Sequence, residues 1–167
     1  MYDDMTKEDI QKIQDEIEYR KMVVRPEAIQ SVKEARAHGD LSEIFEYHAA
    51  KQYKNQNESR IRYLERMIKT AHIIEDESGE DEVGLFNTVT VYIPEDDEEE
   101  KYKIVTTVRG NSLEGLISID SPVGKALLGR KVGDVVTVDV SDAYSYDMEI
   151  RGIEKTKDDG TDGIRSF

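Results

Sequence analysis

The segment "YHAAKQYKNQNESRIRYLERMIKTA", residues 47–71, decides the fold expected of this chain. Every third or fourth residue in it falls on one stripe of an α-helix, with the heptad-like spacing of a coiled coil. The stripe is weakest toward residue 47, where Lys54 and Asn57 take core positions. Its members are Tyr47, Ala50, Lys54, Asn57, Ile61, Leu64, Ile68 and Ala71.

A second periodic stretch precedes this segment. Thr6 is suited to cap a first helix, with Asp9 three residues on, and Pro26 suits a first turn or a kink. The spacing predicts two long antiparallel helices joined by a short turn near Gly39 and Asp40, a rod of about 45 Å. A compact bundle completed by the second half of the chain is the alternative. The apolar positions of the first helix are Ile10, Ile13, Ile17, Ile29, Val32 and Ala35.

Composition limits the classes of function. The 167 residues are 36% charged, carry a net charge of −14 and include no cysteine, so disulfides and thiolate metal sites are excluded. No apolar run is long enough to span a membrane, and the acidic N-terminus is unlike a secretory signal, so we expect a cytoplasmic protein. The acidity argues against direct nucleic-acid binding and favours a protein partner.

The second half changes character after "EDESGEDEVG", residues 75–84. Short β-branched runs follow, and "SPVGKALLGRKVGD", residues 121–134, indicates one short helix with Ser121 as N-cap and Pro122 at its first position. We therefore predict an α+β chain. Its parts are a hairpin over 1–75 with its tip near 39–45, an acidic linker over 76–83, a small antiparallel sheet domain over 84–155 and a disordered tail over 156–167.

Asp40 and Glu43 stand at the predicted turn. They can cap the second helix, a role in which Asp40 satisfies backbone N–H groups. They can instead share a divalent cation, but two carboxylates do not complete a Mg²⁺ site, so a second molecule would have to supply further ligands. No motif of nucleophilic catalysis or phosphate binding accompanies them, and the three histidines are scattered, so we expect no self-contained active site.

Basic residues of the hairpin form the nearest approach to a positive patch. They can pair with Glu58 and Glu65 along the helix face, or form a stripe that touches RNA near the tip. They are Arg36, Lys51, Lys54, Arg60, Arg62 and Arg66.

Three segments resemble the bacterial GreA/GreB transcript-cleavage factors. "RPEAIQSVKEARAHGDLSEIFEYHAAK", residues 25–51, is similar to the family's Arg-Pro-Glu and Ala-Arg…Gly-Asp-Leu-x-Glu hallmark. "ESRIRYLERMIKTAHII", residues 58–74, is similar to its second helix. "LISIDSPVGKALLGRKVGDVVTV", residues 116–138, is similar to its Ile-Ser-x-x-Ser-Pro signature.

The resemblance implies an N-terminal antiparallel coiled coil followed by an FKBP-like domain. Family members bind bacterial RNA polymerase at the rim of its secondary channel and insert the coiled coil. By resemblance, Asp40 and Glu43 help hold a Mg²⁺ ion shared with the polymerase active site, where the backtracked RNA 3′ end is hydrolysed. The chain would then be a monomeric accessory factor, not an enzyme, with no cofactor of its own.

The resemblance also suggests roles for other residues. Arg36, Lys51 and Arg60 are expected near the RNA. Ser121 and Pro122 are expected at the polymerase contact, although helix capping explains their spacing equally well.

The sequence departs from the family pattern at several places. Ile44 and Phe45 replace the Asn and Ala that follow the tip Glu, Asn55-Gln56 replaces Gly-Phe, and "VTTVRGN", residues 105–111, lacks the family's acids. Three functions are weighed. The chain could be an active cleavage factor, and the two tip acids favour this function. It could instead be a channel-binding regulator or inhibitor, in which the apolar pair Ile44 and Phe45 blocks or misplaces the tip. A free-standing prolyl isomerase rests on fold alone.

Overall fold

The structure is a computed structural model that describes residues 3–37, 41–158, 160 and 162–166, with only the backbone described at residues 41–43. The chain divides into two compact units. Residues 7–71 form a helical unit, and residues 3–6 together with 72–166 form a sheet unit. No helix in the described residues is long and apolar enough to cross a membrane.

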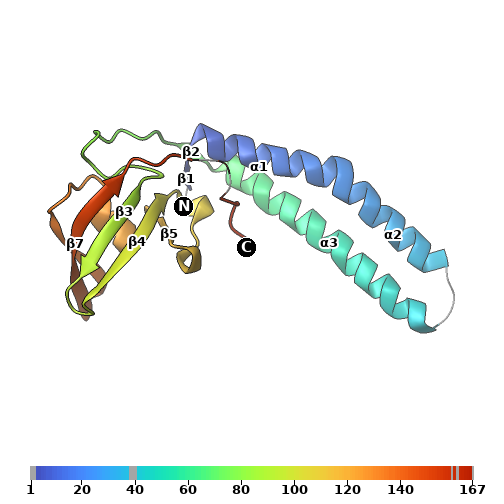
Figure 1. The fold of residues 1–167 in the computed structure, drawn as a ribbon. Coiled ribbons are helices and arrows are strands. Elements are labelled where there is room, and N and C mark those ends of the chain that lie inside the picture. The colour runs from blue at the N-terminus through green and yellow to red at the C-terminus, as the bar shows by residue number, and fades with distance from the viewer. Residues whose placement is uncertain (1–2, 38–40, 159, 161, 167) are drawn as a thin grey trace. The chain divides into compact units, whose positions relative to one another are not determined.

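The helical unit is the predicted antiparallel hairpin (Figure 1). Its first arm is continuous but changes type twice, and its second arm is a single long helix. The first arm comprises α1 (Lys7–Tyr19), a π-helical turn η1 (Arg20–Val24) and α2 (Arg25–Ala37), and the second arm is α3 (Leu41–Lys69).

The π turn lies directly before Pro26. Proline has no N–H to donate, and its ring clashes with the carbonyl four residues earlier in an α-helix. The helix is wider at this point, because the Arg25 N–H donates to the carbonyl of Arg20, five residues earlier, and not to one four residues earlier. A π turn of this kind relieves a mismatch inside a helix without ending it. The kink expected at Pro26 is therefore a π turn in an otherwise continuous arm.

Residues of the predicted stripe lie in the hairpin seam. Ile61 and Leu64 are buried, as the spacing predicts, whereas Ile68 is half-buried and its neighbour Met67 is buried. Asn57 is also buried, because its side-chain amide donates to the Arg20 carbonyl at the π turn (3.3 Å) and accepts from Arg20 Nη1 (3.1 Å). The polar core position is thus matched to the irregular turn opposite it.

The sheet unit is built on a five-stranded sheet with the order β5-β4-β3-β7-β6. The predicted antiparallel arrangement holds for β3, β4, β6 and β7, but β5 runs parallel to β4. Two 3₁₀ turns in residues 106–115 carry the chain across before β5, so these strands do not form a tight hairpin. The elements are β3 (Thr88–Ile93), β4 (Glu98–Val105), η2 (Thr107–Arg109), η3 (Ser112–Glu114), β5 (Leu116–Ser118), α4 (Pro122–Leu127), β6 (Val135–Ser141) and β7 (Tyr144–Glu154).

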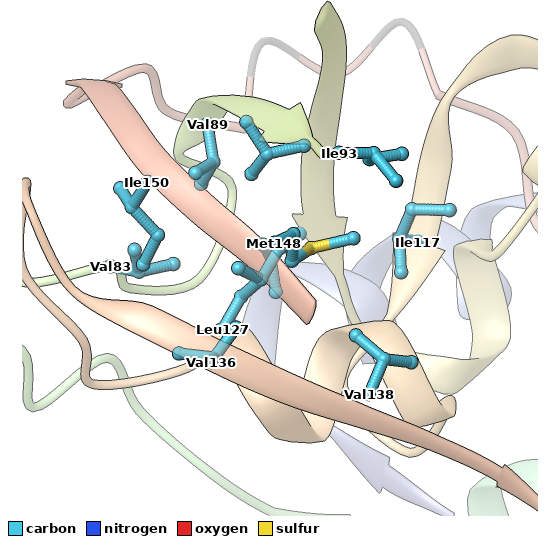
Figure 2. Close-up of a cluster of buried hydrophobic side chains, with 11 residues drawn as sticks. Val83, Val89, Ile93, Ile117, Leu127, Val136, Val138, Met148 and Ile150 are labelled. Atoms are coloured by element: carbon cyan, nitrogen blue, oxygen red, sulfur yellow. The ribbon is translucent and has the colours of Figure 1, made fainter. Parts of the chain in front are cut away.

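The core of the sheet unit lies between α4 and the strands. Figure 2 shows Leu127, from the end of α4, among aliphatic side chains of the sheet, with Met148 of β7 in the middle of the cluster. Leu127 and Met148 are fully buried. Alternate residues of β3 face this cluster, which accounts for the alternating pattern of its sequence.

Two short strands belong to the same unit. β1 (Asp4–Met5) pairs in parallel with β2 (His72–Ile73), so the segments directly before α1 and just after α3 are joined by backbone hydrogen bonds. The predicted hairpin boundary at residue 75 therefore includes a few residues of the sheet unit.

The predicted linker over 76–83 has no helix or strand of its own but is attached to the sheet unit. Val83 is fully buried in the core of that unit. Lys155 Nζ donates to the carbonyls of Gly79 (3.0 Å) and Glu82 (2.8 Å). These contacts fix the segment to the end of β7.

The described residues of the segment 156–167, predicted to be a disordered tail, make specific contacts with the sheet unit. Asp158 accepts a hydrogen bond from Arg109 Nη1 at 2.6 Å, and Asp162 pairs with Lys103 at 3.0 Å. The acidic, glycine-rich composition suggested solvation, but a buried arginine requires a partner. These acids supply partners for two cations of the sheet unit.

Candidate functional site

The candidate site is the tip of the hairpin, between the end of α2 at Ala37 and the start of α3 at Leu41. Asp40 lies outside the described residues; in the sequence it directly precedes Leu41, the first residue of α3. Glu43 is the third residue of α3, and its side chain is outside the described part. The capping role and the metal-holding role of the two acids both stay predictions.

One side-chain contact bridges the two arms beside the tip. Arg36 Nη2 donates to the Tyr47 hydroxyl at 3.2 Å, and the guanidinium carbon lies 5.6 Å from the centre of the Tyr47 ring. The hydrogen bond from Arg36, together with its positive charge, holds the pKa of Tyr47 below its usual value. Because Arg36 is on α2 and Tyr47 is on α3, the contact closes the segment that carries both acids.

The apolar pair that departs from the family pattern is exposed. Phe45 has 79% of its surface accessible and Ile44 has 49%. A large aromatic side chain this open, within the first two turns of α3, is available for contact with a partner molecule. The start of α3 therefore carries exposed apolar surface at residues 44 and 45.

Lys51 is exposed one turn further along α3. Neighbouring polar side chains form a shallow groove with it, including the Asn55-Gln56 pair that replaces the family's Gly-Phe. This groove is open to solvent. The lining residues are His48, Lys51, Gln52, Asn55, Gln56 and Ser59.

Arg60 is not on this exposed face. Its side chain is 11% exposed, and it contacts Glu16 of α1 through Nε at 2.9 Å and Nη2 at 3.3 Å. Arg20 also contacts Glu16, at 2.8 Å. Burial alone raises the pKa of Glu16, but the hydrogen bonds and charges of Arg60 and Arg20 outweigh burial, so this pKa lies below its ordinary value. Arg60 thus joins the two arms within the seam, and its expected place near the RNA stays a prediction.

In the sheet unit, Ser121 caps α4 as predicted. Its hydroxyl accepts from the Gly124 N–H at 3.0 Å and donates to the Ser118 carbonyl at 2.6 Å. Pro122 is the first residue of α4 and is exposed. The hydroxyl of Ser121 is thus engaged within the domain, whereas Pro122 presents its ring to solvent. A polymerase contact at these residues stays a prediction.

The described residues contain no group of three or more His, Cys, Asp or Glu side chains that could hold a metal ion. Asp40 and Glu43 offer carboxylate oxygens, which are the ligands that Mg²⁺ prefers. Two such ligands fit a shared Mg²⁺ ion, with the remaining positions filled by water or by another molecule. The donor set suits a site completed by a partner.

Sequence reasoning did not identify the Arg36–Tyr47 contact. Arg36 stands one residue before the end of α2, whereas Tyr47 stands six residues after the start of α3. Because these distances from the turn are unequal, the spacing carried no signal for the pairing. The pairing of Arg109 with Asp158, 49 residues apart, left no signal either.

Comparisons with known proteins agree with this arrangement. A family model described as "Transcription elongation factor, N-terminal" matches residues 4–73, and one described as "Transcription elongation factor, GreA/GreB, C-term" matches residues 77–155. Transcription elongation factor GreA of Bacillus subtilis (strain 168) is 48% identical over 134 residues, covering 80% of this chain and 85% of its own. GreA of Streptococcus pneumoniae serotype 19F is 41% identical over 153 residues, covering 91% and 95%.

Among solved structures, GreA factor homolog 1 (Gfh1) of Thermus thermophilus is 30% identical, with 92% of this chain and 99% of that chain covered and a TM-score of 0.44. The family assignment does not depend on that structural likeness. It rests on the two family models, which follow one another along the chain, and on relatives with more than 40% identity over most of its length. The chain belongs to the GreA/GreB family of transcription elongation factors.

Proposed function

We propose that this protein binds bacterial RNA polymerase, inserts its helical hairpin into the secondary channel and stimulates the polymerase's own cleavage of backtracked RNA. The observation that carries the proposal is the presence of both Asp40 and Glu43 at the turn of the hairpin in a chain of this family. On this proposal the protein acts as a monomer in the bacterial cytoplasm and contributes no complete active site of its own.

The hairpin is suited to deliver two carboxylates into a narrow space. The 29 residues of α3 span about 44 Å at 1.5 Å per residue, so the acids stand far from the opposite end of the rod. A Mg²⁺ ion held there, together with ligands from the polymerase, would lower the pKa of its bound water. The part of this chain is to present Asp40 and Glu43 as oxygen ligands, with Arg36 and Tyr47 bridging the arms beside them.

The acidic composition supports a protein partner over free nucleic acid. A net charge of −14 repels the phosphate backbone, and specific binding to RNA or DNA requires clustered cations. A factor that reaches RNA only inside a polymerase needs no such cluster. We propose that Lys51, which is exposed on α3, approaches the RNA from the hairpin, whereas the Arg60 side chain is paired with Glu16.

The test is RNA cleavage in a stalled, backtracked complex of the cognate polymerase, with Mg²⁺ varied. Asp40→Asn is the decisive variant, because asparagine is as good an N-cap as aspartate but lacks the charge. We expect it to abolish stimulation while polymerase binding persists. Glu46→Ala, which removes an exposed acid one turn into α3, is the matched control and should be fully active. Full stimulation of RNA cleavage by the Asp40→Asn variant would contradict the metal-holding role and leave Asp40 with the helix-capping role alone.

A second function is favoured by one specific observation, the exposure of Ile44 and Phe45. A bulky apolar pair beside the acids could occupy the channel and hold the tip away from the reacting phosphate. The protein would then bind polymerase and slow elongation without stimulating cleavage. Replacing the pair with the family's residues, Ile44→Asn with Phe45→Ala, should raise cleavage in that case. Unchanged cleavage in this double variant argues against the inhibitor.

The proposed contact of Ser121 and Pro122 with the polymerase can be tested separately from the contribution of these residues to the stability of the sheet unit. Ser121→Ala removes the α4 cap and should lower the stability of the sheet unit by about 1 kcal/mol. Pro122→Ala leaves the capping hydroxyl in place, so a loss of polymerase affinity in this variant would indicate a direct contact. Equal affinity of Pro122→Ala and the unmodified protein would leave both residues with the structural role alone.

A further inference from the structure

We infer that the tail is a latch that holds the N-terminal strand β1 in place. This C-terminal latch is defined as the described residues of 156–166. It begins directly after residue 155, where the match to the family model of the C-terminal domain ends. The inference concerns the isolated protein and does not depend on the proposed function.

The first part of the latch is bound to the edge of the sheet. Thr156 Oγ1 donates to the Phe86 carbonyl at 2.7 Å, and the Thr156 carbonyl accepts from Asn87 Nδ2 at 3.0 Å. Phe86 has a φ of 64°, and it and Asn87 are both buried. The tail therefore takes part in fixing a turn that is unusual for a non-glycine residue.

The middle of the latch neutralises two cations. Arg109 has a side chain only 1% exposed, and it bonds Asp158 at 2.6 Å. Lys103 pairs with Asp162 at 3.0 Å, with side chains 18% and 15% exposed. Placing an arginine in such a site is costly unless a carboxylate accompanies it. The tail thus supplies carboxylates to residues of β4 and η2 that lie 59 and 49 positions earlier in the chain.

The end of the latch reaches the N-terminal segment. The Arg165 N–H donates to the Val108 carbonyl at 2.7 Å, and its Nη1 donates to the Thr107 carbonyl at 3.3 Å. Its Nη2 bonds Asp3 Oδ2 at 3.2 Å, with side chains 33% and 24% exposed. One arginine therefore joins η2 to the residue directly before β1.

Besides the latch, β1 is held by the fully buried side chain of Met5, by the contact of Asp4 Oδ1 with His72 Nδ1 at 2.8 Å and by its pairing with β2. It is two residues long, and its pairing with β2 uses the His72 N–H to the Asp3 carbonyl (2.9 Å) and the Ile74 N–H to the Met5 carbonyl (2.9 Å). Strands this short are marginal on their own. Because the chain passes from β1 into α1 and from α3 into β2, the pair stands at both crossings between the two units. The latch would set how often that pair opens.

Hydrogen exchange of the His72 and Ile74 amides in the full chain, followed by NMR, tests the inference. Arg165→Ala removes a partly exposed ion pair, so we expect exchange of both amides to accelerate by about fivefold, while amides of β3 are unchanged. A chain ending at Gly160 lacks the backbone contact and the Asp162 pair as well, and should show a larger acceleration. Lys157→Ala, which removes an exposed cation of the tail, is the control.

A charge exchange makes the test specific. Asp3→Arg combined with Arg165→Asp restores an ion pair and should return the two amides toward their original rates, although each single change accelerates them. Unaltered exchange in Arg165→Ala overturns the latch. Equal acceleration of every amide, including those of β3, also overturns it, because the tail would then contribute only to global stability.

Discussion

Replacing Arg60 separates a structural role from an RNA-contacting role. In the structure, Arg60 bonds Glu16 across the two arms with two nitrogens, and its ring neighbour Tyr63 lies 5.5 Å from the guanidinium carbon. Arg60→Ala leaves Glu16 partly buried with Arg20 as its remaining partner. We therefore expect a less stable hairpin and no direct loss of RNA contact.

The magnitude follows from burial. Breaking a fully buried ion pair costs about 3–5 kcal/mol, and an exposed pair contributes about 0.2–1 kcal/mol. The Arg60 side chain is 11% exposed and that of Glu16 is 26% exposed, and Arg20 compensates in part. We expect the hairpin to lose about 2 kcal/mol of unfolding free energy. Arg62→Ala, an exposed arginine of the same helix whose Nη2 bonds Ser59, should change it by less than about 0.5 kcal/mol.

The assay is urea unfolding followed by far-ultraviolet circular dichroism, which is dominated by the long helices. The pH dependence gives a second readout. Because the folded-state pKa of Glu16 is depressed, the pair stabilises the hairpin above the unfolded pKa of a glutamate, and this contribution is lost as the pH falls through the folded pKa. Arg60→Ala should weaken that acid-induced loss. Stability equal to that of Arg62→Ala, together with reduced RNA cleavage, would refute the structural role.

Two further predictions follow from single contacts. Gly124→Ala should destabilise the sheet unit by about 1–3 kcal/mol in thermal unfolding, because a Cβ would overlap the Ser118 carbonyl oxygen, whereas Gly163→Ala, which meets open space, should be neutral. Arg36→Ala should raise the pKa of Tyr47 toward its usual value, measured by ultraviolet titration against a Tyr47→Phe reference; an unchanged titration would mean that the bridge beside the tip does not form in solution.

The hairpin could be predicted because its signal is periodic. Residues Ile61 and Leu64 repeat at the spacing of a helix face, and burial of that face follows from the hydrophobic effect alone. The structural role of Asn57 could not be predicted from the spacing. Within its own helix, Asn57 interrupts an apolar stripe. Its side chain, however, hydrogen-bonds to Arg20 in the π turn of the first arm, and that turn depends on Pro26.

The candidate site was predictable only through resemblance. Two acids three residues apart are common in so acidic a chain, and a helix start explains them without any metal. The structure adds the Arg36–Tyr47 bridge and the exposure of Phe45, which are properties of two arms placed together. Such cross-arm contacts depend on the register of the hairpin, which the spacing of residues within one arm does not specify.

The tail shows why composition misjudges some acidic segments. Local charge and glycine content count Asp158 and Asp162 as solvated, and low apolar content argues against a packed segment. That reasoning does not consider buried cations in other segments of the fold, which need a carboxylate partner. Arg109 stands in the segment where the sequence departs from the family's acidic pattern, and a buried guanidinium there needs a carboxylate from outside its own segment. Arg109 and Asp158 therefore form a coupled pair, in which the tail supplies a carboxylate to the buried cation. Removing the cation with Arg109→Met should leave the fold more tolerant of losing Asp158 than the unmodified protein is.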